Sequence, residues 1–142
     1  MSGILEKGEP IVVALGGNAI MDSKGTAPYG EQVAATSVTM RSVAEMIAGG
    51  YPVVLTHGNG PIVGNIMIRH EAAADQIPPM PLEVCVADST GGLGYMIQQS
   101  LRNELHALGV EKEVVTVVNQ VLVSRSDPAF GHPTKPIGPF YN

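Results

Sequence analysis

The chain has 142 residues, of which 44% are hydrophobic and 15% are charged. This length and composition suit one globular domain with a substantial core. The net charge of -5, with a total of 8 Lys and Arg and no basic run, gives no electrostatic footprint for nucleic acid or an anionic membrane. No apolar stretch approaches the ~20 residues of a membrane span, and the N-terminal residues lack a signal-peptide pattern. We expect a cytoplasmic protein with neither a nucleic-acid nor a membrane partner.

The first part of the chain alternates short apolar runs with helical spacing. Ile11 to Leu15 predicts a buried strand, and residues 32–48 carry apolar side chains at helical spacing before the stop signal Gly49-Gly50. A second β-branched run, residues 52–56, predicts another strand that ends in the loop His57-Gly58-Asn59-Gly60. The order of strand, glycine loop and helix therefore occurs twice.

The rest of the chain continues this alternation. Helical spacing predicts a helix from Val63 to Ala74, followed by a break at Pro78-Pro79-Met80-Pro81. Residues 82–107 predict one or two helices, interrupted near Gly91-Gly92 and ended by Gly109. A strand is predicted at Val114 to Val118, with Val121 to Val123 extending it. Strands that alternate with helices indicate an α/β fold with a mostly parallel sheet, covered by helices on both faces.

Two glycine-containing loops follow the two predicted strands. In a parallel sheet the carboxyl ends of the strands meet at one edge, where the binding crevice lies. Glycine allows a ligand to approach the backbone N–H groups closely, and the second loop leads into a helix N-terminus, which favours negative charge. A tight turn that needs positive φ explains the first loop equally well. The residues predicted to form an anion site are Gly16, Gly17, Asn18, Gly58, Asn59 and Gly60.

Lys135 is the one cation in the proline-dense segment 127–139. We expect this segment to form an ordered excursion from the sheet rather than a helix. A lysine held there is either a solvated surface residue or a point charge that stabilises a transferring phosphoryl group.

Other reactive residues give weaker patterns. Ser89, His57 and Asp88 have the residue types of a hydrolytic triad, but nothing resembles a nucleophile elbow. The histidines lack ligand spacing, so we expect no metal site among them. The single cysteine, Cys85, lies in an apolar stretch and is expected to be an inert, packed thiol.

Four segments taken together resemble the successive signatures of carbamate kinases, in the same order and at the same spacing. They are Val12 to Ala19, His57 to Pro61, Asp127 to Phe130 and Pro133 to Tyr141, and they extend over nearly the whole chain. The last of them, PTKPIGPFY, is specific to this family within the amino-acid kinases. The resemblance implies a three-layer α/β/α sandwich and the reversible reaction of ATP and carbamate to ADP and carbamoyl phosphate.

The resemblance also implies roles for particular residues. The two glycine loops would hold carbamate and the transferred phosphoryl group, and Lys135 would contact that group. Residues 1–142 would form one N-terminal acid-binding domain, with a protruding subdomain beginning near 119–142. ATP or ADP with Mg²⁺ would bind to a C-terminal half outside this chain. A homodimer, or a partner supplying that half, a cytoplasmic location and a role in arginine metabolism are implied as well.

Three positions depart from the family pattern. Ile62 and Thr90 stand where the family usually has Gln, and Asn119 stands where it usually has Thr. Polar groups near the expected acid site are thereby lost or shortened. Two alternatives to a carbamate kinase follow: a paralogous kinase for another small carboxylate-like acid, and a non-catalytic acid-binding or regulatory remnant.

Overall fold

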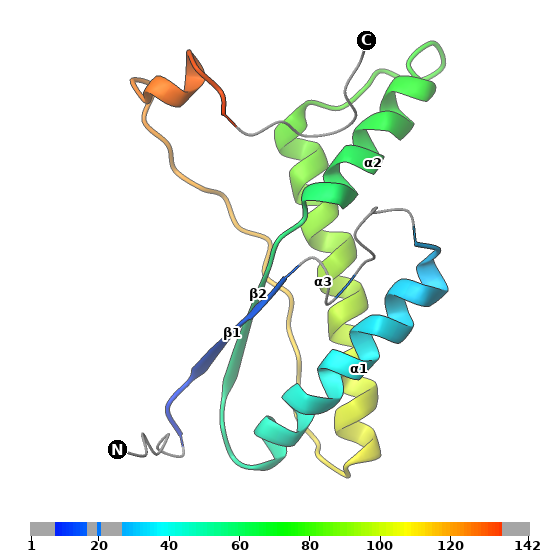
Figure 1. Cartoon of the computed structure of the whole chain (residues 1–142), viewed down its shortest axis with the longest axis vertical. Helices are drawn as coiled ribbons and strands as arrows, with labels where there is room; N and C mark the ends of the chain where they lie inside the picture. Colours follow the sequence, from blue (N-terminus) through cyan, green and yellow to red (C-terminus); the bar gives the residue numbers. More distant parts are fainter. Residues whose placement is uncertain (1–7, 17–19, 21–26, 135–142) are drawn as a thin grey trace. The chain divides into compact units, whose positions relative to one another are not determined.

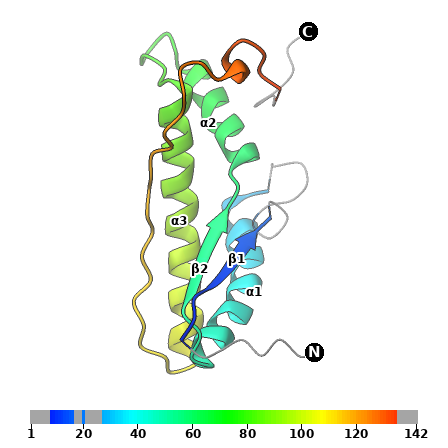
Figure 2. The same ribbon diagram turned by 90° about the vertical axis from the view of Figure 1, so that its left-hand side faces the viewer.

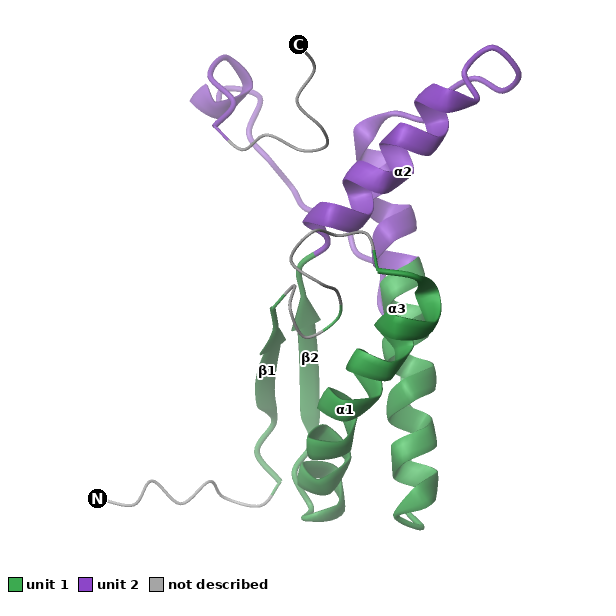
Figure 3. Ribbon diagram, turned by 45° about the vertical axis from the view of Figure 1, so that its right-hand side comes forward, with its two compact units in different colours: residues 1–58, 92–116 green, residues 59–91, 117–142 purple. Residues whose placement is uncertain are grey.

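The computed structural model describes residues 8–16, 20 and 27–134 (Figure 1). Its elements in chain order are β1 (Ile11–Leu15), α1 (Tyr29–Ala48), β2 (Val53–His57), α2 (Gly60–Ala72), α3 (Leu82–Ala107) and the short 3₁₀ helix η2 (Pro128–Phe130). They form two compact units, unit 1 with residues 1–58 and 92–116 and unit 2 with residues 59–91 and 117–142 (Figure 3). Helix α3 contributes to both units. None of the described helices combines the length and the apolar character needed to cross a membrane.

The two strands pair in parallel and belong to unit 1. Their register runs from Ile11 opposite Val53 to Leu15 opposite His57. Helix α1 connects them and contacts β2. This strand, helix, parallel strand order confirms the predicted α/β class and both predicted strands.

The core of unit 1 lies where α1 and the C-terminal part of α3 meet beside the sheet (Figures 1 and 2). On α3 the apolar side chains recur at helical spacing. Arg41 on α1 donates from Nε to Glu104 Oε2 on α3 at 3.2 Å, an exposed ion pair that contributes under about 1 kcal/mol. Apolar burial therefore dominates the packing of these helices. The core side chains of α1 and α3 are Met40, Val43, Ala44, Leu93, Met96, Ile97, Leu101 and Leu105.

The strands bury one face within the described residues. Leu15 is buried, whereas Val12 is 66% exposed and Val54 is 50% exposed. The expectation of strands buried on both faces is therefore not met in this part of the chain. Successive side chains of a strand point to opposite faces, and the packing beside α1 accounts for one of them.

Residues 114–118 and 121–123 form no strand, which corrects the prediction made from their β-branched pattern. The carboxamide of Gln98 on α3 binds this segment instead. Its Nε2 donates to Val114 O at 2.8 Å, and Thr116 Oγ1 donates to its Oε1 at 3.2 Å. The side chain of Val115 is 82% exposed. The β-branched pattern predicts an extended backbone, but a strand also needs backbone hydrogen bonds to a neighbouring strand. Here the carbonyl oxygen of Val114 is bonded to the side chain of Gln98 instead.

The predicted helix ends are largely confirmed. Helix α1 stops before Gly50, whose φ is +95°, and α3 stops before Gly109, whose φ is +69°. The expected interruption of α3 at Gly91-Gly92 is absent, since one helix runs through both residues. Each glycine costs a helix about 1 kcal/mol, which the buried apolar residues that follow on α3 can offset.

Candidate functional site

The two predicted loops begin at neighbouring points of the sheet. Leu15 and His57 are register partners at the carboxyl ends of β1 and β2. Gly16 and Gly58 follow them directly, so the two glycines lie beside each other at one edge of the sheet. This confirms that the loops start at equivalent strand ends, while the anion-binding role of their residues stays a prediction.

Three of the predicted site residues lie outside the described part of the chain. They are Gly17, Asn18 and Lys135. Just before Lys135, the described segment contains η2, whose first turn is capped by Asp127 through a 2.8 Å bond from Ala129 N to Oδ1. The segment 127–139 was expected to be non-helical, and this three-residue 3₁₀ helix lies within its described part.

The glycines at this edge are not required by the backbone or by packing within the described residues. Gly16, Gly58 and Gly60 have no positive φ, so a strained turn does not account for them. A Cβ added at any of the three would meet no described atom within 4 Å. Gly94 on α3 is a contrasting case, because a Cβ there would overlap Thr116. The lack of described atoms beside the first three is consistent with close approach of a ligand to the backbone.

Helix α2 begins at the second loop, and its first N–H groups make no hydrogen bond to another described residue. Asn59 is the N-cap, with φ -140° and ψ 6°, so it is not left-handed, and its side chain makes no capping bond. Val63 N donates to Asn59 O at 3.0 Å. The N–H groups of Gly60 and Ile62 have no partner among the described residues. They lie at the end of the helix where the backbone favours negative charge.

The side chain of Asn59 bonds to α3 instead of capping α2. Its Nδ2 donates to Ser89 Oγ at 2.7 Å, and Ser89 Oγ donates to Val86 O at 2.6 Å. Ser89 is 1% exposed. The sequence had suggested Ser89 only as a weak nucleophile candidate. A better signal was available, because Cys85, Ser89 and Leu93 share one helical face, where a serine within an apolar stripe must find a buried partner.

The remaining sequence candidates behave as packing or surface residues. Cys85 is fully buried, as predicted, with its Sγ 3.7 Å from Met80 O. His57 Nδ1 lies 3.2 Å from the carbonyl oxygen of its neighbour Gly58. Within the ranges that the structure describes, no three His, Cys, Asp or Glu side chains gather closely enough to hold a metal ion.

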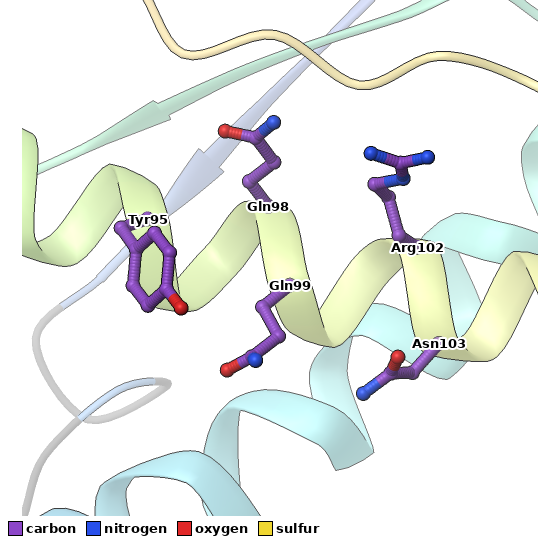
Figure 4. A pocket seen from close by; sticks show the side chains of 5 residues that line it. All are labelled: Tyr95, Gln98, Gln99, Arg102 and Asn103. Atoms are coloured by element: carbon purple, nitrogen blue, oxygen red, sulfur yellow. The ribbon is translucent and has the colours of Figure 1, made fainter.

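A pocket of about 260 Å³ lies along α3 (Figure 4). All of its lining side chains project from that one helix, and none is a predicted site residue. Gln98 is already engaged with Val114 and Thr116. Its lining residues are Tyr95, Gln98, Gln99, Arg102 and Asn103.

A parallel α/β unit with glycine loops side by side at its strand ends defines a class of proteins that bind small, often phosphorylated, ligands. Comparison with known proteins narrows this class. The chain is 50% identical over 136 residues to the carbamate kinase of Pyrococcus horikoshii, covering 94% of this chain and 43% of that protein. It is 48% identical over 136 residues to a carbamate kinase-like protein of Escherichia coli, covering 94% and 43%.

Solved structures agree. The carbamate kinase from Giardia lamblia bound to AMP-PNP superposes with a TM-score of 0.87 at 43% identity, covering 94% of this chain and 42% of that one. No protein-family model matches the chain. The chain spans less than half the length of these relatives. Over its own length it is identified as a homologue of the N-terminal part of the carbamate kinases, and it has their α/β fold.

Proposed function

We propose that the chain supplies the acid- and phosphoryl-binding part of a carbamate kinase-type phosphotransferase. The reaction would be the reversible transfer of a phosphoryl group from ATP to carbamate, giving ADP and carbamoyl phosphate. The observation that carries the proposal is the pair Gly16 and Gly58, which lie beside each other at the strand ends. Neither has a positive φ, and a Cβ added at either would meet no described atom within 4 Å. The identity of about half of the chain's residues to carbamate kinases supports the choice of reaction.

The chemistry of phosphoryl transfer suits such a site. It depends on in-line positioning and on neutralising charge over the phosphoryl oxygens, and it needs no protein nucleophile. Backbone N–H groups of the loops would hold the acid and the transferred group, with Asn59 donating from its carboxamide. Lys135 would supply positive charge on the protruding subdomain that we propose for 119–142.

The nucleotide would bind mainly to residues that correspond to the rest of the relatives' length. Mg²⁺, when bound, would neutralise charge on the nucleotide phosphates. The described residues offer no group of three metal-ligating side chains, so we assign none of them to this ion.

A second candidate function is phosphorylation of a different small carboxylate-like acid. Ile62 places an apolar side chain on the first turn of α2, directly after the loop. The hydroxyl of Thr90 is turned back to Val86 O at 2.9 Å and is not available to a ligand as a free donor. The apolar side chain of Ile62 therefore favours a less polar acid than carbamate. Comparing turnover of carbamate with that of acetate and propionate would separate the two candidates.

We also propose, on the family resemblance, that the protein acts in the cytoplasm as a homodimer in arginine metabolism. Sedimentation of the purified protein tests the oligomeric state. A single species with the mass of one protomer over the micromolar range would contradict the homodimer.

The proposed site can be tested by replacing one open glycine with alanine. Gly58→Ala would put a methyl group where the ligand approaches, while leaving the fold intact, because no described atom lies near that position. We expect kcat/KM for carbamoyl phosphate and ADP to fall at least about tenfold in the chain combined with a C-terminal part. Gly30→Ala, in an equally open position on α1, is the matched control. Equal activity of both variants would remove Gly58 from the site, and inactivity of the parent combination would contradict the phosphotransferase itself.

A further inference from the structure

We propose that Ser89 is a positioning residue for the transfer reaction and that it acts through Asn59, whose carboxamide it holds in one orientation. This inference rests on the function proposed above and adds a residue to its site. The supporting contact lies within unit 2, between the N-cap of α2 and the N-terminal half of α3.

The hydrogen atoms can be assigned from the oxygen contacts alone. Ser89 Oγ lies 2.6 Å from Val86 O, and a carbonyl oxygen cannot donate. The single hydroxyl proton of Ser89 must therefore point at that carbonyl. Only the lone pairs of Oγ remain for Asn59, whose nearest side-chain atom is 2.7 Å away. That atom has to be the donating Nδ2, since Oδ1 in its place would bring two oxygens together without a proton between them.

The orientation has a consequence for what Asn59 offers to a ligand. An N-cap asparagine usually turns its oxygen toward the N–H groups of the first helical turn. Here the side chain makes no such bond, and its nitrogen is drawn to α3 instead. The second N–H of Nδ2 has no partner among the described residues and is available as a donor. A donor suits an anionic acid or phosphoryl oxygen, whereas a freely rotating carboxamide would present its oxygen part of the time and repel that anion.

A purely structural role for the Ser89 hydroxyl can be separated from positioning, because the next residue provides a control. Thr90 Oγ1 donates to the same carbonyl, Val86 O, at 2.9 Å. No bond joins Thr90 to Asn59 in the described part of the chain. Loss of either hydroxyl removes one bond to the α3 backbone, but only loss of the Ser89 hydroxyl releases the carboxamide.

The experiment is a double-mutant cycle in the chain combined with a C-terminal part, assayed with carbamoyl phosphate and ADP. We expect Ser89→Ala to raise the KM for carbamoyl phosphate at least about fivefold, and Thr90→Ala to leave it within about twofold. In an Asn59→Ala background, Ser89→Ala should have no further effect, because the group it positions is already gone. Thermal unfolding of each variant monitors the fold.

Several outcomes would overturn the inference. One is a Ser89→Ala enzyme with unchanged KM, and another is an equal rise in KM for Thr90→Ala. A Ser89→Ala effect of the same size with and without Asn59 would also contradict action through the carboxamide. If Ser89→Ala unfolds, Ser89→Thr keeps the hydroxyl and should restore a near-parental KM where positioning holds. The proposed function itself would fail if the unmutated enzyme showed no phosphoryl transfer, which is a different result from any of these.

Discussion

Two buried hydroxyls in the described residues differ in how they are satisfied. Ser89 both donates and accepts a hydrogen bond, whereas Thr36 Oγ1 on α1 is fully buried and has no partner among the described residues. An unpaired buried hydroxyl costs about 1–3 kcal/mol of stability. Asn59 and Ser89 use their polar groups for one another, while the Thr36 hydroxyl has no such partner in the described part of the chain.

We therefore expect Thr36→Val to stabilise the chain. Valine has nearly the same shape and removes the unpaired hydroxyl, so the free energy of unfolding in urea should rise by about 1 kcal/mol. Thr39→Val is the control, because Thr39 is half-buried on the same helix and its Oγ1 has a partner, Ala35 O, at 3.5 Å. A loss of stability in Thr36→Val beyond that of the control would indicate that the hydroxyl has a partner outside the described residues.

Lys135 is the residue on which the proposed transfer depends most for positive charge. We expect Lys135→Ala to lower kcat by about 10²-fold in the combined enzyme, with folding unchanged by circular dichroism, since one electrostatic donor to the transition state is lost. Lys135→Arg should recover only part of the rate, because a planar guanidinium does not replace a compact ammonium. Lys112→Ala, at an exposed position, is the control. A kcat within about threefold of the parent would make Lys135 an ordinary surface lysine.

At the scale of elements, α3 holds the chain segment that follows it. Gln98 bonds to Val114 and Thr116, and Gly94 leaves room for Thr116 to lie against the helix. Gly94 is thus required by packing, while a Cβ on Gly92 of the same helix would meet no described atom within 4 Å. The two glycines differ in the contact they permit, although both are equally unfavourable in a helix.

This difference predicts opposite effects of alanine. Gly94→Ala should destabilise the chain by about 1–3 kcal/mol, because the methyl group overlaps Thr116 and the segment must move. Gly92→Ala should stabilise it by up to about 1 kcal/mol through helix propensity. Denaturant titrations of the two variants make the comparison. Stabilisation by both substitutions would show that the segment does not lie against α3 in solution.

The elements that could be predicted are those determined by local pattern. Ile11 to Leu15 and the helix ends before Gly50 and Gly109 depend on periodicity and glycine stops, and the structure confirms them. The strand expected at residues 114–118 was wrong, since β-branched residues indicate an extended backbone but not which group binds it. The group that binds this segment is the side chain of Gln98 on helix α3, and the β-branched pattern gives no information about it.

At the scale of the whole molecule, the location of the candidate site followed from topology. Parallel pairing of β1 and β2 was enough to bring Gly16 next to Gly58. The bond from Asn59 to Ser89 could not be predicted in the same way, because it joins residues 30 positions apart and depends on how α2 and α3 pack. Long-range side-chain contacts of this kind require the tertiary structure.

The chain alone covers 43% of the Pyrococcus horikoshii enzyme, and the remaining length is where we propose that the nucleotide binds. We therefore expect the purified chain to bind Mg-ATP no more tightly than about millimolar, measured by titration calorimetry. Adding a C-terminal part should bring the dissociation constant into the micromolar range, because the residues that hold the base and the metal would then be present. ADP without Mg²⁺ serves as a control for nonspecific binding. Micromolar binding of Mg-ATP by the chain alone would place a nucleotide site within residues 1–142 and contradict the division of roles that we propose.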